Sequence, residues 1–251
     1  DGVSAWLGEA IEIKPATTAT FERYARSNLL IIGGEEHGHG LLLATLLSVA
    51  VQCRPSDVSF SILEFARPSS PFHGFFDPVR ELPHEVRIAD RRLAEEELEA
   101  LEADLDERLA DYDGPARPMR FLLIAGMHRW QDLLAEGDYG RLSETAGSLL
   151  RLADKGPDVG IHVVAWADGF VTVDRAVRRS GAGHFGLRAV LRVSSPAESD
   201  VLLGVAAAAG LDDDRGLYRE TEWPTEQVEK FKPYSIPSMW AYLRTIVGTQ
   251  R

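Results

Sequence analysis

The stretch NLLIIGGEEHGHGLLLATLLS, residues 28–48, contains the patterns of two different elements of secondary structure. Residues 28–32 have the composition of a short buried strand, and residues 41–51 are apolar on nearly every face of a helix. A glycine-rich turn separates the two. A strand, a glycine-rich turn and a helix in this order are the layout of a loop that binds phosphate groups, so the stretch predicts the frame of a nucleotide site.

The turn keeps the glycine spacing of the pattern G-x-x-x-x-G-K-[ST] but not its chemistry. Histidine and glycine stand where the lysine and the magnesium-binding hydroxyl belong, and two glutamates occupy a loop whose amides should face an anion. A helix N-terminus stabilises nearby carboxylates by roughly 0.3–1 kcal/mol, so the glutamates are expected to take the place of a phosphate. Taken alone, the glycines could equally shape an ordinary tight turn. The degenerate nucleotide-binding loop comprises Gly33, Gly34, Glu35, Glu36, His37, Gly38, His39 and Gly40.

A second strand of a nucleotide site should end in acidic residues that hold magnesium and activate water. The candidate strand, residues 121–124, is followed by Ala125 and Gly126, which can do neither. Because losing one charge-stabilising group costs about 10²–10³ in rate, we expect no catalytic residue and no ATP hydrolysis here. No cofactor is expected, and ATP and Mg would bind only if the degenerate loop still held them.

The rest of the chain alternates strand and helix patterns. Strands are predicted at residues 58–65, 85–88, 160–168 and 187–193, and helices at 91–112, 142–153, 171–179 and 196–204. Residues 215–220 and 226–234 read as short terminal strands, and 240–247 as a final helix. This alternation predicts an α/β fold with a mainly parallel sheet and helices on both faces. We expect one domain over residues 1–251.

Composition excludes several classes of protein. The formal net charge of −12 disfavours DNA as a partner, with Arg175, Arg178 and Arg179 as the best local basic patch or simply a solvated helix face. A single cysteine, Cys53, excludes a disulfide framework and suits a cytoplasmic location. No apolar run approaches the ~20 residues of a membrane helix. Because the chain begins at Asp1 rather than methionine, we expect it to be part of a longer protein.

Two further groups of residues have types that could form a site. His37 and His39 lie two residues apart in the turn without an evident third ligand, so we expect no metal site. Arg188 and Arg192 fall on one face of a predicted strand. They are candidates to reach the nucleotide of a neighbouring subunit, or they belong to an ordinary exposed strand face.

The order of these segments resembles the motor domains of the FtsK/SpoIIIE group, which are RecA-like P-loop ATPases that pump DNA, and the related EccC proteins of type VII secretion. The similar pieces run over almost the whole chain: WLGEAIEIKP, the glycine turn, RFLLIAGMHRW, GIHVVAWADGF, FGLRAVLRVSSPAESDVLLG and RGLYRE. The likeness is strongest to the last ATPase-like domain of large multi-domain members. The resemblance implies a RecA-like P-loop NTPase fold with short antiparallel C-terminal strands.

Departures from the family pattern limit what the resemblance carries over. Besides the two defective motifs, Trp166, Ala167 and Asp168 stand in the sensor strand where small or polar residues contact the γ-phosphate, and Asp200 replaces a usual basic residue. Asp168 is kept as the sensor-strand candidate.

The resemblance therefore implies a catalytically degenerate module that regulates a larger translocase, for DNA or for type VII-like secretion, through partners or substrate. Its partners would be sibling ATPase domains, ring neighbours or an exported protein, and its location the cytoplasm or the cytosolic part of a membrane-associated machine. Two alternatives stay open: an active ATP-dependent DNA or protein translocase with non-standard ligands, and a purely structural ring-forming domain.

Overall fold

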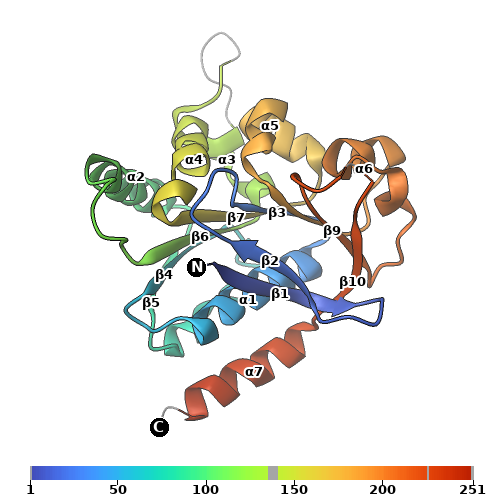
Figure 1. Ribbon diagram of the computed structural model, residues 1–251, viewed down its shortest axis with the longest axis horizontal. Helices are drawn as coiled ribbons and strands as arrows, with labels where there is room; N and C mark the ends of the chain where they lie inside the picture. The colour runs from blue at the N-terminus through green and yellow to red at the C-terminus, as the bar shows by residue number, and fades with distance from the viewer. Residues whose placement is uncertain (1, 135–140, 225, 250–251) are drawn as a thin grey trace.

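A computed structural model describes residues 2–134, 141–224 and 226–249, and in this part the strands form one ten-stranded sheet (Figure 1). Its strand order is β2-β1-β10-β9-β8-β3-β7-β6-β4-β5. The strands are β1 (Val3–Ala10), β2 (Thr17–Phe21), β3 (Leu29–Ile32), β4 (Val58–Glu64), β5 (Glu85–Ala89), β6 (Met119–Ala125), β7 (Ile161–Ala167), β8 (Leu187–Val190), β9 (Gly216–Glu220) and β10 (Glu229–Pro233).

The half of the sheet from β8 to β5 is parallel, as the alternation of strands and helices predicted. Strand β3 lies between β7 and β8, with Leu30 opposite Ala165 on one side and Arg188 on the other. Every residue of β3 and β7 is buried, which explains why both read as continuous apolar runs rather than alternating ones. The carboxyl ends of β3, β7, β6 and β4 therefore meet at one edge of the sheet.

Helices cover both faces of the sheet (Figure 1). The helices α1 (Glu35–Gln52) and α7 (Ile236–Thr249) lie on one face, and the other carries α2 (Ala94–Ala110), α3 (Gln131–Leu134), α4 (Glu144–Lys155), α5 (Phe170–Gly181) and α6 (Pro196–Leu203). Two apolar clusters fill the space between the sheet and these layers. In the acidic helix α2, Leu98, Leu101 and Leu105 lie at helical spacing and form a buried apolar stripe.

The other half of the sheet is antiparallel and contains more strands than the sequence predicted. The terminal strands β9 and β10 are confirmed, but β10 also pairs with an N-terminal hairpin of β1 and β2 that the residue pattern did not predict. Gly8 allows this pairing, because a Cβ there would lie 2.1 Å from the Lys232 carbonyl oxygen. No helix in the described ranges is long and apolar enough to cross a membrane.

Candidate functional site

The glycine turn after β3 is shorter than the sequence predicted. Helix α1 begins at Glu35, so the segment 35–40 forms the first turns of a helix and only Gly33 and Gly34 remain as the turn. Gly33 has φ of 150°, and a Cβ there would lie 2.7 Å from Leu191 Cβ, so this position requires glycine. Acidic residues in a first helical turn are stabilised by the helix dipole, which is why Glu35 and Glu36 favour helix over loop.

Trp166, from the end of β7, packs directly on the first turns of α1. Its indole Nε1 donates a hydrogen bond to the Gly33 carbonyl oxygen at 2.9 Å. A Cβ on Gly38 would lie 2.3 Å from the indole ring. Gly38, the second glycine of the phosphate-loop spacing, therefore leaves the room in which this side chain packs. Trp166 is 1% exposed and lies wholly within the core.

His39, at the position of the phosphate-loop lysine, points into an aromatic cluster rather than into solvent. Its ring stacks on Phe72 with centroids 4.3 Å apart, and Phe75 and Trp166 each lie 5.0 Å away. The Nδ1 atom is 2.8 Å from the Glu35 carbonyl oxygen, and burial lowers the pKa of the imidazole. A neutral, enclosed ring supplies neither the charge nor the reach of a lysine ammonium.

Gly40, at the position of the magnesium-binding hydroxyl, faces the segment that leads into α7. A Cβ there would lie 3.5 Å from Ile236 Cγ1 and 3.7 Å from the Tyr234 carbonyl oxygen. This distance is ordinary van der Waals contact, so the C-terminal segment covers the place of the missing hydroxyl.

The Glu35 carboxylate forms an ion pair at the N-terminus of α1. Arg129 Nη1 donates to Glu35 Oε1 at 2.5 Å, and Ser70 Oγ donates to the same oxygen at 3.4 Å. The hydrogen bond from Arg129 lowers the pKa of this carboxyl group. Glu36 is exposed and His37 is half-buried. The anion beside this helix end is thus a side chain of the protein itself.

The end of β6 carries no acidic side chain. Ala125 is its last residue, and Gly126 follows with φ of 103°, which begins the turn into residues 127–129. Asp168, predicted in the sensor strand, comes directly after β7, where its Oδ1 accepts from Thr172 Oγ1 at 2.6 Å and lies 3.9 Å from His128 Nδ1.

One acidic residue at this edge was not singled out from the sequence. Glu64, the last residue of β4, accepts hydrogen bonds from the amides of Gly74 and Phe75 at 2.7 and 3.3 Å, and burial raises the pKa of its carboxyl group. The feature of the sequence that could have identified Glu64 is a single carboxylate at the end of an otherwise largely apolar strand. Its hydrogen bonds hold the segment that packs on His39, so Glu64 has a structural partner on its own chain.

Arg188, one of the two candidates to reach a neighbouring subunit, makes its hydrogen bonds within its own chain. Its guanidinium donates to the carbonyl oxygens of Phe185, Leu202 and Ala182 at 3.1, 2.7 and 3.1 Å, and burial lowers the pKa of this group to about 10. The alternation of residues along the strand predicted on which face of the sheet the Arg188 side chain lies. It could not predict the three backbone carbonyl groups that accept its hydrogen bonds. Arg192 lies beyond the end of β8, exposed, and pairs with Asp213 at 3.0 Å.

The other candidate features are separate from this edge. The three arginines Arg175, Arg178 and Arg179 are exposed on α5. No group of three His, Cys, Asp or Glu side chains among the described residues is placed to hold a metal ion.

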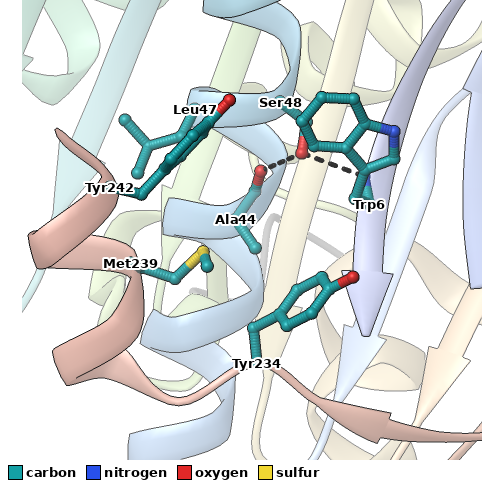
Figure 2. Close-up of a pocket in the computed structure, with 7 residues that line it drawn as sticks. All are labelled: Trp6, Ala44, Leu47, Ser48, Tyr234, Met239 and Tyr242. Atoms are coloured by element: carbon teal, nitrogen blue, oxygen red, sulfur yellow. Dashed lines mark hydrogen bonds between the residues drawn. The ribbon is translucent and has the colours of Figure 1, made fainter. Parts of the chain in front are cut away.

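An apolar cavity of about 230 Å³ lies between α1, α7 and β1 (Figure 2). The hydroxyl of Ser48 in its wall is already used, since it donates to the Ala44 carbonyl and accepts from the Trp6 amide. The lining residues are Trp6, Ala44, Leu47, Ser48, Tyr234, Met239 and Tyr242.

The chain is similar in structure to ATPase domains of secretion and conjugation machines. The cytoplasmic domain of the Thermomonospora curvata type VII secretion ATPase EccC superposes with a TM-score of 0.74 at 17% identity, covering 98% of this chain and 31% of EccC. The pCW3 conjugation coupling protein TcpA, in its monomer form with ATPγS, gives 0.73 at 14% identity, covering 100% of this chain and 70% of TcpA. ATPases 2 and 3 of T. curvata EccC, in complex with a signal sequence peptide, give 0.71 at 19% identity, covering 99% and 46%.

These similarities confirm the predicted RecA-like P-loop fold and, at the level of the fold, the resemblance to FtsK/SpoIIIE-type ATPase domains. The chain spans about a third of the EccC cytoplasmic domain and about half of the two-ATPase form. No protein-family model and no curated protein matches the sequence.

Proposed function

We propose that this chain is a catalytically degenerate ATPase-like module that binds partner domains or a protein substrate within a larger translocase. The observation that carries the proposal is the use of the nucleotide loop for packing. Gly38 seats Trp166, His39 fills an aromatic cluster and Gly40 faces the approach to α7. A loop committed to these contacts has no lysine, hydroxyl or acidic partner to offer a nucleoside triphosphate and magnesium.

The similar proteins support the partner-binding part of the proposal. One EccC structure, whose fold this chain shares, contains ATPases 2 and 3 in complex with a signal sequence peptide. A module of this fold that does not bind nucleotide can still bind sibling ATPase domains or an exported protein through its surface.

An active motor is the second candidate function, because TcpA, with the same fold, was determined with ATPγS. The two candidates differ in whether nucleotide binds at the N-terminus of α1. Gly34 is the position to alter, since it is exposed and a Cβ added there would have no atom within 4 Å.

The test is calorimetric titration of the whole chain with ATPγS and MgCl₂. We expect no saturable heat up to about 1 mM, which corresponds to a binding free energy weaker than roughly −4 kcal/mol. Saturable binding that is lost in Gly34→Glu, with the melting temperature of the variant unchanged, would overturn the proposal in favour of the active motor.

A further inference from the structure

A cleft of about 650 Å³ opens at the carboxyl ends of β4, β5 and β6, beside the degenerate loop. Its size lies in the range of about 300–1,000 Å³ typical of ligand sites. In open α/β sheets, ligands bind outside the carboxyl ends of the strands, so the position is also a usual one. Residues from three different connections contribute to the walls: Arg67 after β4, Arg91 and Arg92 after β5, and Arg129 after β6.

Guanidinium groups dominate the polar lining, although the protein as a whole is strongly acidic. Arg67 and Arg92 are exposed, and neither side chain makes an ion pair or hydrogen bond with another described residue. Among the side chains that the structure describes, Arg91 donates only to a neutral amide, that of Gln131. Three guanidinium groups in the cleft thus lack a carboxylate partner among the described residues.

Each acidic group of the cleft already has a partner other than the Arg67, Arg91 and Arg92 side chains. Asp77 lies 3.8 Å from Arg80, and Asp90 Oδ1 accepts the backbone amide of Arg92 at 2.9 Å. Glu64 accepts two backbone amides, and burial raises the pKa of its carboxyl group, which favours its neutral form. The cleft therefore offers positive charge in a chain whose net charge is −12, and its complement is a ligand with several carboxylates.

The cleft also has an apolar wall and lies beside an edge strand of the sheet. Ile88 and Leu93 line it, and Leu93 is 50% exposed. Strand β5, which contains Ile88, is the last strand in the sheet order and, among the described strands, pairs with β4 alone. The main-chain groups on its outer edge suit an extended peptide, which a free phosphate could not use.

We propose that this cleft binds an acidic, extended protein segment with apolar side chains between its carboxylates. The segment lies along β5, its carboxylates meet the guanidinium groups of Arg67, Arg91 and Arg92, and an apolar side chain contacts Ile88 and Leu93. The inference rests on the proposed partner-binding role and gives that partner a chemistry. It needs nothing from the nucleotide loop.

The test uses a fluorescein-labelled peptide of alternating Glu and Val, with binding to the whole chain followed by fluorescence anisotropy. We expect saturable binding that weakens when salt is raised from about 50 mM to about 200 mM. The double substitution of Arg67→Gln and Arg92→Gln is expected to weaken binding about tenfold or more. Arg54→Gln with Arg244→Gln is the matched control, because both arginines are exposed and lie outside the cleft.

Two further arms decide the kind of ligand. A peptide with N-methylated backbone amides should bind at least about tenfold more weakly, and inorganic phosphate should not displace the labelled peptide at millimolar concentration. The proposal is overturned if the cleft double variant binds as the wild type does, if the N-methylated peptide binds equally well, or if phosphate displaces the peptide completely. ATPγS titration is the separate test of the degenerate loop, so failure of the cleft leaves that result unchanged.

Discussion

The indole of Trp166 packs so closely on the backbone of Gly38 that no side chain fits between them. A Cβ on Gly38 would lie 2.3 Å from the ring. The contact joins the end of β7 to the first turns of α1. The Trp166 indole also donates a hydrogen bond to the Gly33 carbonyl oxygen at 2.9 Å. A loop around a phosphate needs open space over its amides, whereas here a buried tryptophan covers the helix.

Gly38→Ala should destabilise the protein by about 1–3 kcal/mol, because the added methyl group overpacks against a rigid buried ring. Alanine normally stabilises a helix relative to glycine by roughly 0.5–1 kcal/mol. Gly147→Ala in α4 is the matched control, since no atom lies within 4 Å of its Cβ, and it should show that gain. Urea unfolding of the two variants checks the prediction, and equal stabilisation by both would contradict it.

Trp166→Ala should reduce the free energy of unfolding by about 3–5 kcal/mol, the usual cost of emptying a large buried aromatic site. The cavity would lie beside His39 and Gly38, which lose their packing partner. Trp240 on α7 is only half-buried, so Trp240→Ala should cost clearly less. Denaturant midpoints measure both. A loss below about 1 kcal/mol for Trp166→Ala would mean that the ring is not held as the contacts imply.

Arg188→Met should destabilise the protein by about 1–3 kcal/mol, because three backbone carbonyls lose their charged donor. Arg192→Met should stay within about 0.5 kcal/mol, since its ion pair with Asp213 is exposed. Thermal unfolding compares them, and sedimentation reports the oligomeric state. An Arg188→Met variant of unchanged stability but altered sedimentation would restore the contact with a neighbouring subunit.

The sequence predicted the parallel half of the sheet well, because buried strands such as β3 and β7 are short apolar runs bounded by glycine turns. It missed β1 and β2, since β1 contains Gly8 and pairs with β10, a strand more than two hundred residues away in the chain. Local patterns carry little information about such a partner.

For the candidate site, the sequence identified which residue types replaced the phosphate-loop lysine and hydroxyl. It did not predict that His39 turns inward, because the rings around it come from Phe72, Phe75 and Trp166. These residues join α1 only through tertiary packing. The helical start at Glu35 was missed for a related reason: the run of glycines and histidines has weak helix propensity, and its helix is stabilised by contacts with β7 and the segment before α7.

The protein should become less stable as the pH is lowered, because His162 is fully buried on β7. Its Nδ1 lies 2.7 Å from the Ser27 carbonyl oxygen, Nε2 has no partner among the described residues, and burial lowers the pKa of the ring from 6.5 to about 4. In the unfolded chain the ring takes up a proton near its ordinary pKa, whereas the folded ring stays neutral to about 4. The histidine therefore costs no stability above pH 6.5, and stability is lost as pH falls from 6.5 towards 4.

The expected loss is about 3 kcal/mol over that window, from about 1.4 kcal/mol per unit of pKa difference. His162→Gln removes the titration while keeping a polar side chain, so the pH dependence of its unfolding free energy should be flatter by about this amount. The raised pKa of Glu64 makes stability rise as the pH falls. This effect is the same in the wild type and in the variant, so it cancels in the difference between their unfolding free energies. Urea unfolding at a series of pH values measures that difference. Parallel pH profiles for the two proteins would show that the buried ring is protonated without cost, against its complete burial on β7.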